Sequence, residues 1–227
     1  MDRNSAFVKT LDKIGAKLKS MESRAEYARM FYGAGDMAAA YAQAFKLEAS
    51  AEQAALLSRA LPAYTGHPNA GPDIEKVMRN NIPVRIGFTR EGWFSLQIPL
   101  LLPKKQGGSV EYIRSFLYPA LRDFFLPRPS VRYTDCVIIY RHVYDRRRPE
   151  RRRRDHDNIE TNTVTDAVAL YVMPDDDPSV CTHYYCGAAG GRERTEVYVV
   201  PKTDFQDWLT HEPEMPEESP ALYETMP

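Results

Sequence analysis

A heptad pattern of apolar residues near the N-terminus constrains the fold of this chain more than any other feature. Its members recur in alternating steps of four and three: Phe7, Leu11, Ile14, Leu18, Met21, Ala25, Ala28 and Tyr32. Such a stripe covers one side of an α-helix and requires a second helix to pack against it. The chain is therefore expected to begin with paired helices.

A second apolar stripe follows over residues 37–61, after a break at residues 33–36. Glycine in this break disfavours a continuous helix, and Asp36 is suited to cap the next one. We predict an antiparallel, coiled-coil-like helical hairpin over residues 1–61, with the second helix divided near Ser50, where a capping-box pattern occurs. Its role is open between a scaffold for the rest of the chain and an arm that oligomerises or docks a protein partner.

The remainder of the chain alternates helix and strand signals, so the fold class expected for the whole chain is α+β. Residues 62–82 contain several prolines and glycines and are expected to form a linker with a short helix. Residues 83–210 are expected to form a mixed α/β domain. Its predicted elements are a β-hairpin over 84–88 and 93–102, a helix over 109–125, a buried strand over 133–140, a helix beginning near 158, a second hairpin turning at 187–191, and a short helix over 202–209. The acidic, proline-rich residues 211–227 are expected to be a disordered tail.

Composition narrows the class of protein. A hydrophobic content of 43% in 227 residues is enough for a sizeable core. No apolar run approaches the ~20 residues of a membrane span, and the N-terminus lacks the apolar core of a secretory signal. A cytoplasmic protein without a membrane partner is therefore expected. The three cysteines form no CxxC pair, which favours free thiols; a zinc site at Cys181, His183 and Cys186 is the alternative.

Local charge differs sharply from the overall net charge of −1. Within residues 141–177, an arginine-dense stretch is followed by Asp155-His156-Asp157-Asn158 and then by Asp175-Asp176-Asp177. Carboxylates bind Mg²⁺, whose other ligands are water and substrate phosphates, and arginines bind the phosphate backbone. The pattern is typical of a metal-dependent phosphodiesterase. The alternative is a solvated charged loop and a polar turn.

These residues carry a resemblance to a known family. Asp155-x-Asp157-Asn158, then Asp166-Ala167, then Asp176-Asp177 resembles the central motif of the RusA-like Holliday junction resolvases, and the order of strands matches over roughly residues 84–205. The resemblance implies a homodimer and magnesium-dependent cutting of branched DNA, with manganese as a substitute metal. It implies catalytic and metal-binding roles for Asp155, Asp157 and Asp177, with Asp176 as a further metal ligand, and supporting roles for Asp166, His156 and Asn158.

The chain departs from that motif at two points. The interval between Asp157 and Asp166 is one residue longer than in the family. The family's lysine on the first turn of the following helix has no equivalent, since Thr161 and Asn162 stand nearest. We expect this loss to affect catalysis more than metal binding.

The whole chain also resembles an uncharacterised family encoded on mobile elements of Gram-positive bacteria, through phrases such as LPAYTGHP and IGFTREGWF. This second resemblance implies no known activity, and the acidic motif leaves two functions open. One is a metal-dependent nuclease acting on branched DNA or structured RNA. The other is a non-catalytic factor on a decayed nuclease fold that binds nucleic acid or a nucleoprotein, for example in counter-defence as an anti-CRISPR protein. The residues expected to contact nucleic acid are Arg146, Arg147, Arg148, Arg151, Arg152, Arg153, Arg154, Lys104 and Lys105.

Overall fold

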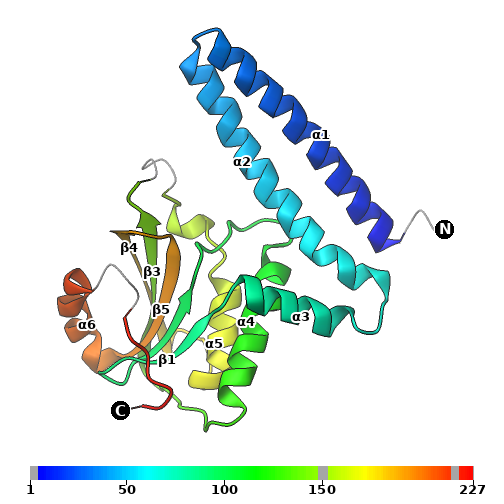
Figure 1. Ribbon diagram of the computed structural model, residues 1–227. Coiled ribbons are helices and arrows are strands. Elements are labelled where there is room, and N and C mark those ends of the chain that lie inside the picture. The colour runs from blue at the N-terminus through cyan, green and yellow to red at the C-terminus, as the bar shows by residue number, and fades with distance from the viewer. Residues whose placement is uncertain (1–4, 148–152, 216–219, 227) are drawn as a thin grey trace. The chain divides into compact units, whose positions relative to one another are not determined.

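The heptad pattern folds as a helical hairpin (Figure 1). The computed structural model describes residues 5–147, 153–215 and 220–226, and the chain divides into two units, Met1–Ile74 and Glu75–Pro227. In the first unit, α1 (Ala6–Gly33) contacts α2 (Met37–Ala60). Asp36 Oδ1 accepts a hydrogen bond from the Ala39 amide at 2.9 Å, and Gly35 has a φ of +78°. The predicted hairpin and its cap are confirmed.

One detail of the hairpin differs from the prediction. α2 is continuous through Ser50, because the Ser50 hydroxyl donates to the Lys46 carbonyl at 3.0 Å within the helix instead of capping a new one. The expected division of this helix is wrong. Residues 61–81 then carry a 3₁₀-helix, η1 (Leu61–Thr65), and α3 (Ala70–Asn81), so the region predicted as a linker with a short helix contains two helical elements.

The second unit is built on a five-stranded sheet with the order β1-β2-β5-β3-β4. Its strands are β1 (Arg85–Phe88), β2 (Phe94–Ile98), β3 (Cys136–Asp145), β4 (Cys181–Gly190) and β5 (Arg194–Pro201). β3 and β4 are parallel, and the other neighbours are antiparallel. The chain passes from β3 to β4 through η3 (His156–Asn158) and α5 (Asn162–Val172), which makes a β-α-β unit.

The two faces of this sheet bury different side chains, because successive residues of a strand point to opposite sides. One face is covered by α4 (Ser109–Phe125) and α5: the Phe94 ring lies 5.8 Å from that of Phe125 in α4, and the Tyr140 hydroxyl lies 2.7 Å from the Thr165 hydroxyl in α5. We call this the α4/α5 face. The other, which we call the α6 face, packs on α6 (Phe205–His211) around the buried Trp208 (Figure 1).

The predicted β1–β2 hairpin is confirmed, but the predicted second hairpin is wrong. β4 continues to Gly190 and pairs with β3 along its whole length, from Cys136 opposite Cys181 to Asp145 opposite Gly190. β5 pairs with the other edge of β3 and with β2. β3 therefore lies between β4 and β5. The sequence pattern predicted the strands β4 and β5, but an alternation of apolar and polar residues does not show which strands pair with each other.

The C-terminal segment holds more order than its composition suggests. His211 ends α6, and residues 212–214 form the 3₁₀-helix η5 (Glu212–Glu214). Phe88 and Tyr223 exchange two backbone hydrogen bonds of 2.8 Å, which extends the β1 edge of the sheet. The Gln97 side chain donates to the Pro220 carbonyl at 2.8 Å. The disordered tail expected over residues 211–227 is thus not seen in its described part, because backbone pairing is insensitive to an acidic composition.

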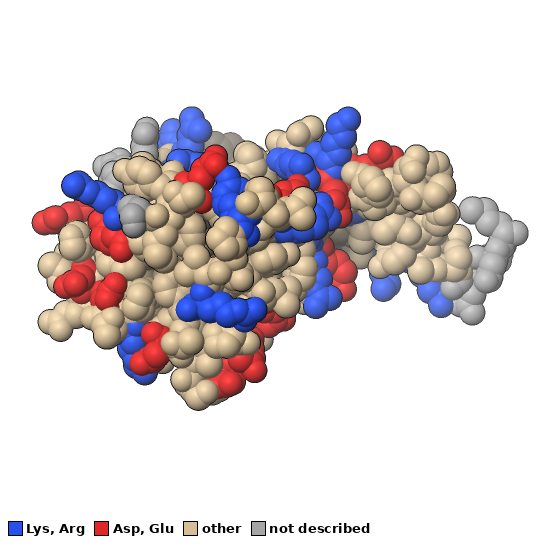
Figure 2. Space-filling model, turned by 90° about the horizontal axis from the view of Figure 1, so that it is seen from below, with Lys and Arg blue, Asp and Glu red and all other residues tan. Residues whose placement is uncertain are grey.

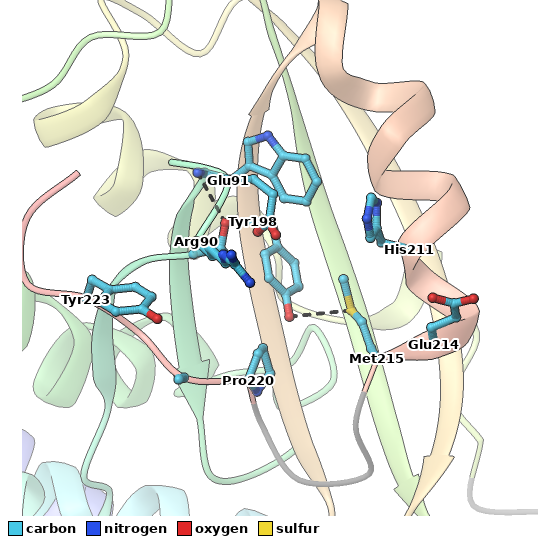
Figure 3. Close-up of a pocket in the computed structure, with 11 residues that line it drawn as sticks. Arg90, Glu91, Tyr198, His211, Glu214, Met215, Pro220 and Tyr223 are labelled. Carbon is cyan, nitrogen blue, oxygen red and sulfur yellow. Dashed lines mark hydrogen bonds between the residues drawn. The ribbon is translucent and has the colours of Figure 1, made fainter. Parts of the chain in front are cut away.

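A pocket of about 300 Å³ lies between this segment and the sheet (Figure 3). Its lining includes Trp93, just before β2, and Tyr198 in β5, together with His211, Met215 and Tyr223 from the chain beyond β5. The Tyr198 hydroxyl oxygen lies 3.8 Å from the Met215 sulfur. The pocket is therefore a gap under the C-terminal segment.

Gly87 in β1 packs closely against the C-terminal segment, so a substitution there tests the pairing of that segment with β1. A Cβ atom there would lie 2.6 Å from the Tyr223 carbonyl oxygen and 2.9 Å from Leu222 Cβ. We expect Gly87→Ala to lower the free energy of unfolding by about 1–3 kcal/mol, because backbone atoms must shift to admit the methyl group. Urea unfolding measures this. Gly191→Ala is the control, since nothing lies within 4 Å of a Cβ there; equal effects of the two substitutions would contradict the packing.

Candidate nuclease-like site

Residues 155–158 lie at the end of the β3–α5 connection, against the α4/α5 face. The His156 ring packs on the ring of His142 in β3 at 5.6 Å and on that of Tyr185 in β4 at 5.5 Å. Tyr185 in turn stacks on Tyr140 at 5.5 Å, with an interplanar angle of 16°. His156 therefore anchors the short helix η3 to the sheet, a packing role that the sequence did not indicate.

A basic loop from a distant part of the chain lies beside this motif. The Lys105 amide donates to the Asn158 carbonyl at 2.8 Å, and Lys104 forms a β-bridge with Ile159. The Arg154 guanidinium donates to the carbonyl of Leu102, just before the same loop. The backbone thus brings Lys104, Lys105 and Arg154 next to residues 155–158, and both lysine side chains are exposed.

The carboxylates of Asp155 and Asp157 are exposed. Neither has a hydrogen bond or ion pair to another residue within the part of the chain that the structure describes. The start of α5 is capped by Glu160, whose Oε1 accepts from the Thr163 amide at 3.2 Å and from the Thr163 hydroxyl at 3.1 Å. Glu160 therefore caps the start of α5, and neither Asp155 nor Asp157 has that role.

The second acidic cluster divides between two tasks. Asp177 Oδ1 accepts hydrogen bonds from the amide and hydroxyl of Ser179, at 2.6 and 2.5 Å, which hold the pKa of Asp177 below its usual range. Asp177 therefore stabilises the turn that leads into β4. Asp176 instead lies near Asp166 of α5, where partial burial and the Asp176 carboxylate raise the pKa of Asp166, with Arg114 opposing the rise.

The structure thus brings Asp166 and Asp176 together. Among residues 5–147, 153–215 and 220–226, no three His, Cys, Asp or Glu side chains form a group that could hold a metal ion. A joint ligand set of Asp155, Asp157 and Asp177 stays a prediction. The zinc alternative fails on geometry, because the alternation of β4 directs Cys186 to the face opposite Cys181 and His183, and all three cysteines are free thiols.

The arginines of residues 146–154 have different environments in the structure. Arg147 pairs with Asp145 at 2.9 Å, Arg153 is exposed, and Arg148, Arg151 and Arg152 lie outside the described residues. On the face of the molecule in Figure 2, basic and acidic side chains are interspersed. Phosphate contacts by these arginines remain a prediction.

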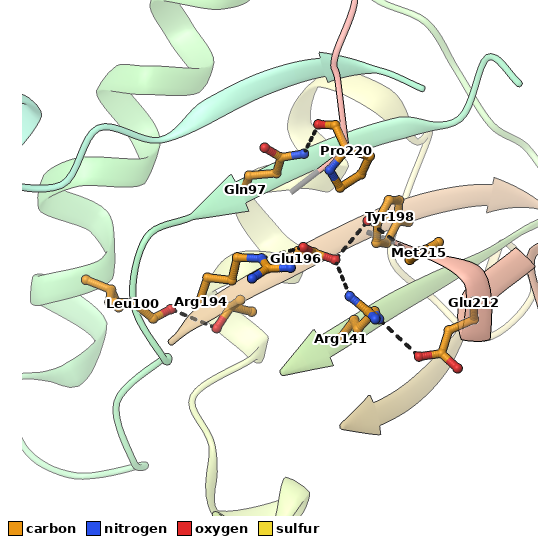
Figure 4. A network of polar contacts seen from close by, with 10 residues as sticks. Gln97, Leu100, Arg141, Arg194, Glu196, Tyr198, Glu212, Met215 and Pro220 are labelled. Carbon is orange, nitrogen blue, oxygen red and sulfur yellow. Dashed lines mark hydrogen bonds and ion pairs between the residues drawn. The ribbon is translucent and has the colours of Figure 1, made fainter. Parts of the chain in front are cut away.

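Arg141 has a structural role instead. It is buried on the α6 face, where its guanidinium donates to Glu196 at 2.9 Å and to Glu212 at 3.0 Å (Figure 4). Glu196, also fully buried, accepts further hydrogen bonds from Arg194 at 2.6 Å and from the Tyr198 hydroxyl at 2.9 Å. Sequence reasoning missed this network; its signal was a charged residue at an inward-facing position of each of two buried strands.

Comparison with protein-family models gives a match over nearly the whole chain. A family of unknown function, DUF6100, matches residues 2–226. The chain belongs to the DUF6100 family. No curated protein matches it. In the described part of this DUF6100 chain, no helix is both long enough and apolar enough to cross a membrane.

Buried His142 gives this DUF6100 member a specific pH dependence. Burial, with the nearby His156 and Arg154, lowers the pKa of His142 from 6.5 to about 4. Between these values the unfolded chain binds a proton that the folded protein does not, so stability falls as the pH drops through this window and is fully present above it. Each pH unit between these two pKa values corresponds to about 1.36 kcal/mol. Acidification from pH 7.5 to 5.0 therefore lowers the free energy of unfolding by at most about 2 kcal/mol through His142.

Urea unfolding of His142→Leu at the two pH values measures the effect. We expect the variant to lose less stability on acidification than the unsubstituted protein, because the titrating group is gone. His67→Gln, at an exposed loop position, should leave the loss unchanged. Identical pH dependence in His142→Leu and the unsubstituted protein would show that His142 is not held neutral.

Proposed function

We propose that this protein is a metal-dependent, nuclease-like protein that acts on structured or branched nucleic acid. The observation that carries the proposal is the juxtaposition of exposed Asp155 and Asp157 with Lys104, Lys105 and Arg154, produced by backbone pairing between two distant segments. A phosphodiester needs positive side chains to hold it and carboxylates to position a cation beside it.

The pair of Asp166 and Asp176 supports a divalent cation. Burial and the neighbouring Asp176 carboxylate raise the pKa of Asp166, and a cation bound between the two carboxylates relieves their repulsion. Mg²⁺ requires only one or two protein carboxylates, because waters and substrate phosphates complete its six ligands. These residues therefore fit Mg²⁺, with Mn²⁺ as a substitute. When bound, such an ion activates water and neutralises charge on the leaving oxygen.

The order β3, η3, α5, β4 supports a RusA-like domain, since the acidic motif precedes the helix of a β-α-β unit and the second cluster follows it. A homodimer and a place in mobile-element biology belong to the same proposal. The second candidate is a binding factor without catalysis, such as a counter-defence protein. It is favoured by Thr161 and Asn162 at the position of the family's lysine: Thr161 is buried, and its carbonyl accepts from Tyr140.

A cleavage panel separates these candidates. Branched DNA, duplex DNA, single strands and structured RNA are incubated with Mg²⁺ or Mn²⁺ and the purified protein. We expect metal-dependent cleavage of a branched or structured substrate, reduced at least tenfold in Asp157→Asn and in Asp166→Asn. Asp123→Asn, in a surface ion pair with Arg79, is the matched control. If the protein binds one of these nucleic acids but cleaves none of them with either metal, the nuclease proposal is wrong and the binding factor is supported.

The lysine loop makes a prediction that does not depend on catalysis. Each phosphate contact contributes about 0.9 to the slope of log affinity against log salt concentration. We expect Lys104→Gln with Lys105→Gln to weaken binding and to reduce this slope by up to about 2. Fluorescence anisotropy at several salt concentrations measures both. Lys202→Gln is the control, since Lys202 lies at the opposite end of β3, beside Asp135; an unchanged slope in the double variant would remove the loop from the interface.

A further inference from the structure

Two cysteines lie directly opposite each other at the start of the parallel strands β3 and β4. Cys136 is the first residue of β3, Cys181 is the first residue of β4, and the register pairs them. Tyr140 and Tyr185 follow at even steps along these strands and stack on each other, so both cysteine side chains share their α4/α5 face. Both cysteines are buried free thiols. The function proposed above gives neither of them a role.

The spacing of the two strands suits a disulfide bond. Neighbouring strands lie about 4.7–4.9 Å apart, and a disulfide joins Cα atoms that are about 4.4–6.8 Å apart. The Cys136 sulfur lies 3.4 Å from the Met173 sulfur and 3.6 Å from the carbonyl oxygen of Val180, the residue just before Cys181. The two thiols therefore come together without a large movement of the backbone.

A histidine lies beside Cys181 on the same strand. His183 is two residues further on, so its side chain shares the α4/α5 face, and its Nδ1 lies 3.1 Å from the Tyr185 hydroxyl oxygen. The contact with the Cys136 thiol, and then that with His183, lower the pKa of Cys181, although burial opposes the shift. The pKa of Cys136 is raised by its contact with Cys181 and by burial. Cys181 is therefore the thiolate of the pair, and the thiolate is the nucleophilic form.

The third cysteine provides a contrast within β4. The Cys186 side chain lies on the opposite, α6 face, and burial raises its pKa to about 12. β4 is an edge strand of the sheet, and Thr182 and His183, which follow Cys181, are exposed. Because Cys181 itself is buried, only a small oxidant reaches its sulfur. The structure thus distinguishes one reactive thiol, one partner thiol and one unreactive thiol.

We propose that Cys136 and Cys181 form a reversible disulfide in response to a peroxide. The Cys181 thiolate attacks one oxygen of hydrogen peroxide, the O–O bond breaks, and the departing hydroxide takes up the proton released when the thiolate formed. The product is a sulfenic acid at Cys181 and one water. The Cys136 sulfur then attacks the Cys181 sulfur, the S–O bond breaks, and the hydroxyl leaves with the Cys136 proton as a second water. Two thiols are oxidised, one peroxide is reduced, and an added dithiol reverses the bond by exchange.

Peptide mass spectrometry of the full-length protein tests this pairing. The reduced protein is treated with hydrogen peroxide, its remaining thiols are alkylated after denaturation, and it is digested without reductant. We expect one intramolecular disulfide between Cys136 and Cys181 that dithiothreitol reverses, while Cys186 is recovered as the alkylated thiol. Cys186→Ser is the matched control and should form the same disulfide at the same rate.

Dimedone, which reacts with sulfenic acids, identifies the thiol that attacks the peroxide. We expect an adduct at Cys181 in Cys136→Ser, where the partner thiol is absent, and no adduct at Cys136 in Cys181→Ser. His183→Gln should raise the pH at which the oxidation rate of Cys181 is half-maximal by about one unit, because a group that favours the thiolate is lost.

A comparison within the unsubstituted protein keeps the test decisive if Cys136→Ser is poorly folded. The loss of each thiol with time in peroxide is followed by mass spectrometry, and Cys181 should be oxidised at least about tenfold faster than Cys186. A disulfide that includes Cys186 or joins two chains overturns the proposal. Equal oxidation rates of Cys181 and Cys186, or no disulfide at all, do so as well.

Discussion

The central strand β3 is the element on which the rest of the second unit depends. It is paired on both edges, by β4 and β5, and nearly all of its side chains are buried. Adjacent residues Arg141 and His142 point to opposite faces, so a single dipeptide sends a cation into one face and an imidazole into the other. Burying an ionisable side chain is costly, so the neighbours of Arg141 and of His142 must compensate for it.

The two faces solve this problem differently. Arg141 keeps its charge, because Glu196 and Glu212 surround it with carboxylates. Breaking such a buried pair by removing one partner costs about 3–5 kcal/mol, since the remaining charge stays buried. His142 instead loses its charge, because burial lowers its pKa, and it packs against His156 as a neutral ring. The acidic motif is held on the sheet through that contact.

The position of residues 155–158 follows from the parallel pairing of β3 and β4. Ligands of open α/β sheets bind outside the carboxyl ends of parallel strands. Residues 155–158 rest against the α4/α5 face there, because the His156 ring packs on the ring of His142. The two ends of the connection after β3 lie on different faces of the sheet: Arg146 lines a cavity on the α6 face, whereas Arg154 donates a hydrogen bond to the Leu102 carbonyl, beside residues 155–158.

Elements with a strong local signal could be predicted from the sequence. The hairpin followed from its heptad and from Asp36, the β1–β2 hairpin from two apolar runs around a turn, and the buried strand from residues 136–140. What required the structure was non-local. The insertion of β5 between β2 and β3, the bridge between Lys104 and Ile159, and the pairing of Tyr223 with Phe88 join residues far apart in sequence, and no periodicity specifies such partners.

The candidate site likewise contains residues that the sequence could identify and contacts that it could not. Neighbouring carboxylates and lysines could be found by composition, but their fates depend on local hydrogen bonds. Asp177 is engaged by Ser179, whereas Asp176 faces Asp166, although the two are adjacent and chemically identical. Glu196 had no functional motif around it, because a buried counter-ion is defined only by the arginines that reach it.

The central proposal is that the exposed carboxylates of Asp155 and Asp157 and the pair of Asp166 and Asp176 bind divalent cations. Paramagnetic broadening of amide signals by Mn²⁺, recorded by two-dimensional NMR on the full-length protein, tests it most directly. The account predicts that the amides of Asp166, Asp176 and residues 155–158 broaden first, and that excess Mg²⁺ restores them. Broadening confined to other carboxylates, such as Asp123, or no selective broadening at all, would contradict it.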